Sequence, residues 1–124
     1  MARRRPSTPG IDGILLVDKA NGPTSHDVVA KVRRIAGQPR IGHGGTLDPL
    51  ATGVLPIALG EATKLCGRML DASKTYDFTI CFGTETSGLD AEGDIVGTSD
   101  ARPTLELVQQ ALAQFTGPIE QIPP

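Results

Sequence analysis

The sequence predicts a mixed α/β fold of the α+β kind. Four short apolar stretches are typical of β-strands, and three longer segments carry apolar residues at helical spacing. Hydrophobic residues make up 39% of the 124 residues but aromatic residues only 3%. A core must therefore come from Val, Ile, Leu and Ala. The elements alternate along the chain without an internal repeat.

The first strand is expected over residues 11–17, which end in an apolar run, and the turn residues Ala-Asn-Gly-Pro follow at 20–23. Ser25 is predicted to cap a helix that carries Asp27 in its first turn, where the helix dipole favours an anion. Gly37 suits the C-terminal end of this helix. The following residues share one apolar face: Val28, Val29, Val32, Ile35 and Ala36. Lys31, Arg33 and Arg34 lie off that face and should present positive charge to solvent.

Residues 42–53 contain four glycines and a proline, which favours a long ordered loop over a regular element. The apolar stretch 54–59 is predicted to be a buried strand. Pro56 within it indicates an edge position or a bulge, because proline cannot donate to a ladder. Residues 61–70 should be helical, with Ala62, Leu65, Cys66, Met69 and Leu70 on one side.

Residues 76–82 alternate between apolar and more polar side chains, a pattern that predicts a strand with one buried face. The polar segment 83–93 is expected to be a loop, and a short strand should start at Ile95. Thr104 is predicted to cap a last helix that reaches Phe115 and stops at Gly117.

Several protein classes are excluded or disfavoured by composition. No apolar run approaches the roughly 20 residues that cross a bilayer, so no membrane association is expected. Residues 1–10 are rich in Arg and Pro and lack the apolar region of a secretory signal. Cys66 and Cys81 are too few for a disulfide framework or a zinc site. A reduced, cytoplasmic protein is the expectation.

The net charge of −2 hides an asymmetry between the two parts of the chain. Residues 1–76 hold 11 Lys and Arg against 6 Asp and Glu, and residues 77–124 hold 1 against 8. This pattern is compatible with a face that binds a polyanion, although charge alone favours an ordinary solvated surface. Residues 1–10, with three consecutive arginines, are expected to form a disordered basic arm able to touch phosphates.

The loop around Asp48 is the most informative segment. It lacks the Gly-Lys-Ser/Thr of a P-loop and the spacing of a dinucleotide fingerprint. Its distinctive feature is a single carboxylate between Leu47 and Pro49, and the proline restricts the backbone of the residue before it. Asp48 is therefore either an aimed functional carboxylate or the first residue of an Asx-type turn.

His43 stands five residues before Asp48 and could donate a hydrogen bond, contact a base or fill a passive position. A metal site is not expected, because His26, Cys66 and Cys81 show no ligand-like spacing. A Ser-His-Asp hydrolase is disfavoured because no Gly-x-Ser-x-Gly elbow is present.

Residues 42–53, Gly-His-Gly-Gly-Thr-Leu-Asp-Pro-Leu-Ala-Thr-Gly, resemble the catalytic motif of TruB-type pseudouridine synthases. The resemblance extends to residues 18–25, 60–64, 74–76, 83–93 and 121–124, and so covers the chain from about residue 11 to its end. Two positions depart from the family pattern. Ala20 replaces the usual proline, which softens a turn, and Gly88 stands where threonine is frequent.

The resemblance implies isomerisation of uridine to pseudouridine in tRNA, at position 55 of the T arm in tRNA numbering. The N–C glycosidic bond breaks and a C–C bond forms to the same sugar carbon, so the reaction needs no nicotinamide, ATP or metal cofactor. In the family pattern Asp48 is the catalytic carboxylate, and the target base is flipped out. His43 and Tyr76 match substrate-binding positions, Tyr76 as the residue that stacks on the uracil. Lys19 matches a position that is more structural than catalytic.

The resemblance also implies a mostly antiparallel sheet flanked by helices, of which residues 11–124 would be the N-terminal portion of the catalytic domain. The remainder and any C-terminal RNA-binding domain would lie outside this chain. The expected partner is the tRNA T arm, with no obligate protein partner and a monomer at full length. Two alternatives stay open: a fragment that binds RNA without activity, and a dyskerin-type enzyme that depends on a guide RNA.

Overall fold

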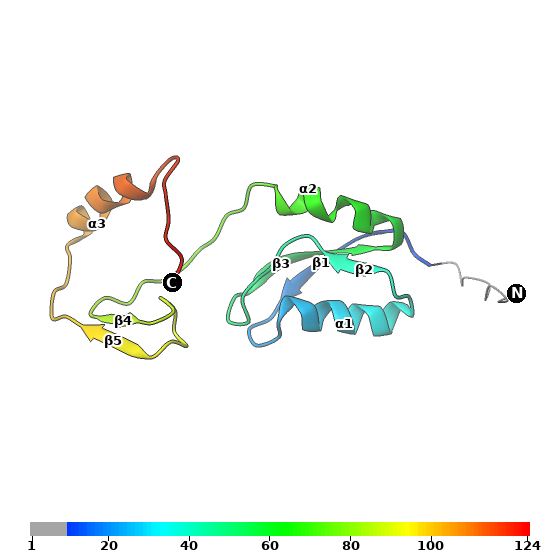
Figure 1. The fold of residues 1–124 in the computed structure, drawn as a ribbon, viewed down its shortest axis with the longest axis horizontal. Coiled ribbons are helices and arrows are strands. Elements are labelled where there is room, and N and C mark those ends of the chain that lie inside the picture. Colours follow the sequence, from blue (N-terminus) through cyan, green and yellow to red (C-terminus); the bar gives the residue numbers. More distant parts are fainter. Residues whose placement is uncertain (1–9) are drawn as a thin grey trace, which may run out of the picture. The chain divides into compact units, whose positions relative to one another are not determined.

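The computed structural model describes residues 10–124 and has the mixed α/β architecture expected from the sequence, with antiparallel sheets and helices (Figure 1). The basic arm predicted for residues 1–10 lies outside the described residues except for Gly10. The chain divides into two units, the first ending at Thr75 and the second running from Tyr76 to Pro124. Each unit is described by itself below.

Unit 1 is built on a three-stranded antiparallel sheet with the order β1-β3-β2. Its strands are β1 (Gly13–Lys19), β2 (Ile41–His43) and β3 (Gly53–Leu59). The predicted first and second strands are confirmed. β2 was not expected, because three residues are too few to show an apolar alternation.

The edge position expected from Pro56 is wrong, since β3 is the central strand. Pro56 pairs with Leu16 of β1, and its carbonyl accepts a hydrogen bond of 2.9 Å from the Gly44 backbone N–H on the opposite side. The N–H that proline lacks would point the same way as this carbonyl. It would therefore face Gly44, just past the end of β2, so the β2–β3 ladder stops at this pair because proline has no N–H to return the bond.

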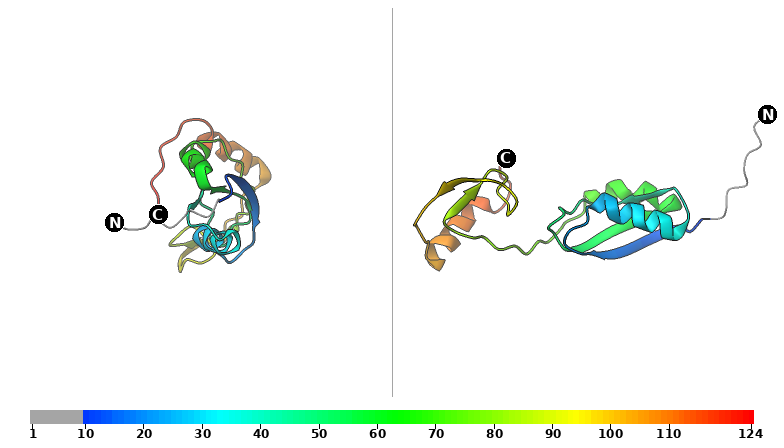
Figure 2. Two further views of the ribbon diagram at one scale, coloured as in Figure 1. Left: turned by 90° about the vertical axis from the view of Figure 1, so that its right-hand side faces the viewer. Right: turned by 90° about the horizontal axis from the view of Figure 1, so that it is seen from below.

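Helix α1 (Ser25–Ala36) runs alongside this sheet, as Figure 1 and the right-hand view of Figure 2 show. Val29 of α1 packs into the core with the buried strand residues Ile41, Leu55, Ile57 and Leu59. Gly37 ends the helix in the left-handed conformation, with φ of 63°, as predicted. Ile35 is 77% exposed, so its predicted place on the buried face is wrong.

The N-cap of α1 is Thr24 and not Ser25. The Thr24 hydroxyl accepts a 3.0 Å hydrogen bond from the Asp27 backbone N–H, and the Asp27 carboxylate accepts one of 2.9 Å from the Thr24 N–H. This reciprocal pair is a capping box with Asp27 at its third helical position. Ser25 therefore does not cap the helix, and only 2% of its surface is exposed.

The predicted helix 61–70 is present but divided into the 3₁₀-helix η1 (Gly60–Leu65) and the α-helix α2 (Cys66–Leu70). The Thr63 hydroxyl donates a 2.8 Å hydrogen bond to the Gly60 carbonyl. This backbone acceptor lies at the start of the 3₁₀-helix η1, which is wound more tightly than α2. These helices lie on the side of the sheet opposite α1 (Figure 1). Ala58, which alternates with the core residues of β3, is fully buried as well.

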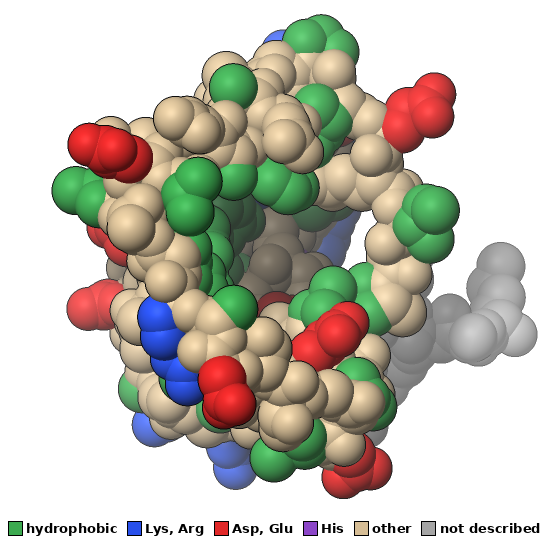
Figure 3. Space-filling model, turned by 90° about the vertical axis from the view of Figure 1, so that its left-hand side faces the viewer, with side chains coloured by type: hydrophobic (Ala, Val, Ile, Leu, Met, Phe, Trp, Pro, Cys, Tyr) green, Lys and Arg blue, Asp and Glu red, His purple; other side chains and the backbone are tan. Residues whose placement is uncertain are grey.

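Unit 2 contains an antiparallel hairpin of β4 (Thr84–Thr86) and β5 (Ile95–Thr98), then α3 (Leu105–Leu112) and the short η2 (Ala113–Phe115). β5 and α3 were predicted, and Thr104 caps α3 through a 3.3 Å bond from the Leu107 N–H. The loop expected over 83–93 is partly wrong, because β4 forms its first part. Hydrophobic side chains of unit 2 reach the surface, as the green areas of Figure 3 show.

The strand predicted over 76–82 is wrong: within the described residues this segment forms no ladder with another strand. Its apolar residues are exposed: Tyr76 by 58%, Phe78 by 77%, Ile80 by 60% and Phe82 by 43%. Apolar alternation defines a buried face only when a neighbouring strand and a covering layer are present. Neither is found for this segment among residues 10–124.

The helices of the described chain are all too short or too polar to cross a membrane.

Candidate active site

The Asp48 loop, residues 44–52, joins β2 to β3 across one end of the sheet in unit 1. Gly44 and Gly45 are buried, whereas Asp48 is exposed. The Asp48 carbonyl accepts a 2.9 Å hydrogen bond from the Ala51 N–H, which closes a turn through Pro49. Among the described residues the Asp48 carboxylate accepts no hydrogen bond, so the turn is made by the backbone and not by the Asx arrangement left open above.

Lys19, the last residue of β1, holds the backbone that follows Asp48. Its side chain is fully enclosed, with 1% exposure. The ammonium donates to the carbonyl oxygens of Ala20 at 2.8 Å, Pro49 at 3.1 Å and Ala51 at 2.7 Å. Three donors therefore meet three acceptors, which is what a buried ammonium requires. The Gly22 N–H donates to the same Pro49 carbonyl at 2.7 Å.

Ser25 holds the backbone that precedes Asp48. Its hydroxyl accepts a hydrogen bond from the Leu47 N–H at 2.9 Å and donates to the Leu47 carbonyl at 3.1 Å. Both polar backbone groups of Leu47 are thus satisfied by one buried hydroxyl from the start of α1. Asp48 consequently stands between two residues, Leu47 and Pro49, whose positions are fixed from outside the loop.

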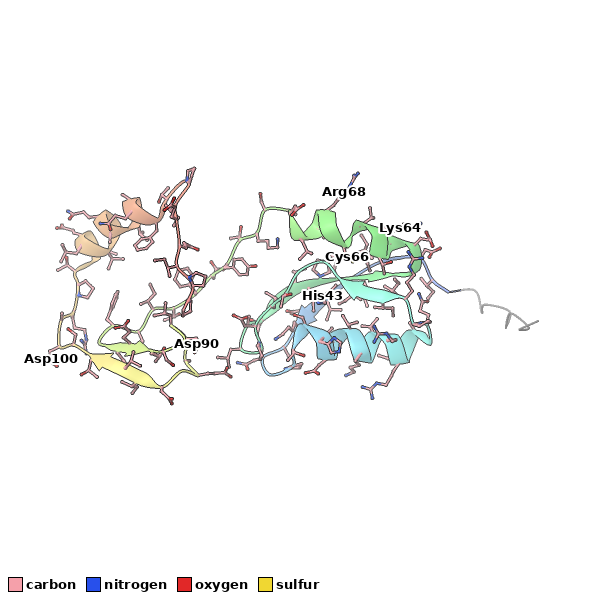
Figure 4. All side chains as sticks on the ribbon, in the orientation of Figure 1. His43, Lys64, Cys66, Arg68, Asp90 and Asp100 are labelled. Atoms are coloured by element: carbon pink, nitrogen blue, oxygen red, sulfur yellow. The ribbon has the colours of Figure 1, made fainter. Side chains whose placement is uncertain are left out.

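His43 was predicted to lie in the loop, and this is wrong. It is the last residue of β2, where it pairs with Ile57. It is half-buried, and Figure 4 labels it in the middle part of unit 1. Its Nδ1 contacts the Gly45 carbonyl oxygen. Because a carbonyl can only accept, Nδ1 is the donor of this contact, which leaves Nε2 as the ring nitrogen without a partner among the described residues.

The glycines of this region allow α2 to approach the loop closely. A Cβ atom built on Gly44 would lie 2.6 Å from the Cβ atom of Met69, and one on Gly42 would lie 3.4 Å from the Cys66 sulfur. Side chains at Gly44 would therefore collide with α2, since real Cβ contacts at 2.6 Å are essentially absent from proteins.

The basic residues of unit 1 are only partly available to a polyanion. Arg33, expected in solvent, donates to the carbonyls of Pro39 at 3.1 Å and Ile41 at 3.4 Å. Arg40 and Lys64 both pair with Glu61, at 2.8 Å and 2.5 Å. The hydrogen bond and charge of Lys64, followed by the charge of Arg40, hold the pKa of Glu61 below its usual value. Arg68 reaches away from the sheet in Figure 4.

The structure thus places Asp48 on the loop between β2 and β3 and His43 at the end of β2 beside Ile57, while Tyr76 is the first residue of unit 2. Sequence patterns missed the loop contacts of Ser25, because a serine before an apolar face is equally typical of a cap. Within residues 10–124 no three His, Cys, Asp or Glu side chains come together as a metal site would require.

A model of the TruB family of pseudouridylate synthases, N-terminal domain, matches residues 33–124. The chain is 58% identical over 119 residues to tRNA pseudouridine synthase B of Novosphingobium aromaticivorans, covering 92% of this chain and 39% of that protein. It is 52% identical over 124 residues to tRNA pseudouridine synthase B of Caulobacter vibrioides, covering 100% and 40%. The chain thus spans about two fifths of the length of these curated relatives.

Among solved structures, a similar chain belongs to an H/ACA ribonucleoprotein bound to a substrate RNA containing 2'-deoxyuridine. It has 50% sequence identity and a TM-score of 0.44, and the match covers 45% of this chain and 18% of that chain.

Proposed function

The chain belongs to the TruB family of pseudouridylate synthases, and we propose that it forms the catalytic-loop part of an enzyme that isomerises uridine to pseudouridine in tRNA. Two relatives with at least 52% identity carry the name tRNA pseudouridine synthase B. This name favours tRNA as substrate over the guide-RNA-dependent alternative. The T arm, at position 55 in tRNA numbering, is the substrate site we propose.

Asp48 is the proposed catalytic residue. The isomerisation breaks the N–C glycosidic bond, turns the uracil and forms a C–C bond to the same sugar carbon, so atoms and electrons balance within the nucleotide. A carboxylate can assist as a nucleophile or as a base during this exchange. It must be placed accurately against a flipped-out nucleotide, whose extrusion itself costs a few kcal/mol.

One observation supports this role above the others: the backbone on both sides of Asp48 is held from outside the loop while its carboxylate stays exposed. Here Lys19 of β1 and Ser25 of α1 fix the main chain and leave the carboxylate for a ligand. Fixing a reacting group in advance is a large source of rate enhancement.

His43 and Tyr76 are the proposed substrate-binding residues. The Nε2 atom of His43 is the ring nitrogen left for a substrate, because Nδ1 is used by Gly45. Tyr76 offers an exposed aromatic ring, the kind of surface on which a single-stranded base stacks. We propose that the protein works in the cytoplasm, where tRNA is modified, as a monomer without an obligate protein partner.

The test uses a completed chimera, in which residues 1–124 replace the aligned first part of the Novosphingobium aromaticivorans relative. Asp48→Asn keeps the size and loop contacts of the residue and removes its negative charge. We expect it to abolish pseudouridine formation on tRNA while the affinity for tRNA stays within about tenfold, or about 1.4 kcal/mol. Turnover is followed by tritium release from C5-labelled uridine.

Asp71→Asn is the control, because Asp71 is another exposed carboxylate of unit 1, at the end of α2. It should retain full turnover. Wild-type turnover by the Asp48→Asn chimera would refute the assignment of Asp48. Absence of turnover in the unaltered chimera, with tRNA bound, would instead favour an RNA-binding role for this chain.

A further inference from the structure

We propose that Ser25 is a positioning residue for Asp48, acting through its hydrogen bonds to Leu47. This inference rests on the proposed function. Its structural core, the dependence of the loop on one hydroxyl, can be measured without any activity.

The contact joins two parts of the chain that are 22 residues apart. The Ser25 hydroxyl meets both the N–H and the carbonyl of Leu47, so it fixes the peptide planes on either side of that residue. The carbonyl plane of Leu47 leads directly into Asp48. A shift of that plane displaces the Asp48 carboxylate as a whole, and no side chain of the described residues restrains this carboxylate directly.

The helix itself does not need the Ser25 hydroxyl. The capping positions at the start of α1 are filled by Thr24 and Asp27, which satisfy each other. Ser25 is also 2% exposed, so its hydroxyl has no competing partner in solvent. Its contribution is therefore directed at the loop and not at the helix that carries it.

Lys19 and Ser25 differ in what they hold. Lys19 binds the carbonyls of Pro49 and Ala51, which follow Asp48, and it also binds its own neighbour Ala20. Ser25 alone holds both groups of the residue before Asp48. Loss of the Ser25 hydroxyl should thus free one side of Asp48 while the other side stays fixed, which moves the carboxylate without opening the loop.

Ser25→Ala should lower kcat in the completed chimera by about 10- to 100-fold, because displacements near 1 Å cost about that much in positioned reactions. KM and the affinity for tRNA should change less than about threefold, since the carboxylate is not needed to hold the RNA. Ser25→Thr restores a hydroxyl and should recover most of kcat.

Thr63→Val is the matched control. The Thr63 hydroxyl also donates one hydrogen bond, to the Gly60 carbonyl, and accepts one, from the Arg40 Nε, but it contacts η1 and not the Asp48 loop. This variant should keep wild-type kcat.

The structural readout is amide hydrogen exchange in the 124-residue chain. Ser25→Ala should accelerate exchange at Leu47 by about tenfold or more, while the amides of β3 keep their protection. Thr63→Val should leave Leu47 unchanged.

Three results would overturn the proposal: unchanged exchange at Leu47 in Ser25→Ala, wild-type kcat in Ser25→Ala, or an equal loss of kcat in Thr63→Val. If the unaltered chimera forms no pseudouridine, the proposed function fails, and the exchange at Leu47 still decides whether Ser25 holds the loop.

Discussion

Replacing Lys19 by methionine should destabilise unit 1 strongly. Methionine keeps the length and much of the volume of the side chain but removes the ammonium. The carbonyls of Ala20, Pro49 and Ala51 would then lose the donor that they share. The connection between β1 and the Asp48 loop would lose its polar contacts at the same time.

The magnitude follows from these three bonds. The Pro49 carbonyl keeps the Gly22 N–H, so two carbonyls lose their partner; at about 1–3 kcal/mol for each this gives about 2–6 kcal/mol. Ala20 is exposed and Pro49 and Ala51 are half-buried, so water replaces part of the loss, and the desolvation of the ammonium is recovered. We expect a net loss of about 2–4 kcal/mol. A unit of this size has a total stability of only about 4–11 kcal/mol.

The assay is urea unfolding followed by circular dichroism at the helical band, because the chain has no Trp and its single Tyr lies in unit 2. Hydrogen exchange of β1 and β3 assigns the change to unit 1. Lys31→Met is the control, since Lys31 is exposed on α1, and it should change the free energy of unfolding by less than about 0.5 kcal/mol. A Lys19→Met variant within that same margin would show that the three contacts contribute nothing.

Three further predictions concern other parts of the chain. Gly44→Ala should cost about 1–3 kcal/mol in urea unfolding, because its Cβ would meet Met69 at 2.6 Å, and a loss below about 0.5 kcal/mol would contradict this contact. Tyr76→Phe in the completed chimera should keep tRNA affinity, whereas Tyr76→Leu should lose the about 1–3 kcal/mol of a stacked base, and equal behaviour would make the ring a packing residue. The Thr24 backbone N–H and then the Thr24 hydroxyl contact hold the pKa of Asp27 below its usual value, so the stabilising effect of Asp27 is present at neutral pH and disappears as the pH falls below about 4. Asp27→Asn should therefore unfold earlier than wild type at neutral pH but not at pH of about 2, and a constant difference would show that its charge is irrelevant.

Local patterns predicted those elements whose stability is decided locally. The apolar face around Val29 and the glycine at position 37 were enough to place α1. The turn chemistry of Gly117 and the cap at Thr104 did the same for α3. In such segments the intrinsic propensity, the capping residues and the apolar face all favour a helix.

The failures concern properties that depend on distant partners. Pro56 indicated an edge strand, yet β3 lies between β1 and β2, and β2 ends just before the position that the missing N–H would face. Residues 76–82 have a strand pattern, but no neighbour pairs with them among the described residues. Whether a segment forms a central strand, an edge strand or no strand depends on which other strands pair with it. The sequence of the segment itself does not specify those partners.

The candidate site divides in the same way. Asp48 stood out because glycines and a proline surround it, which is a local signal. The contacts that position it, from Lys19 and Ser25, span up to 32 residues and leave no periodic trace in the sequence. Which hydroxyl caps the helix and which one holds the loop became clear only from the structure.

Within the described residues, the hydrogen bonds that fix the Asp48 loop are all made by its main-chain atoms. The outward side chains of Thr46, Leu50 and Thr52 are exposed and take no part in them. A mutational scan of these three positions should therefore leave folding intact. Any change in the choice of RNA sequence within such a library would report contact with the nucleic acid itself, which makes the loop a place where recognition can be altered separately from stability.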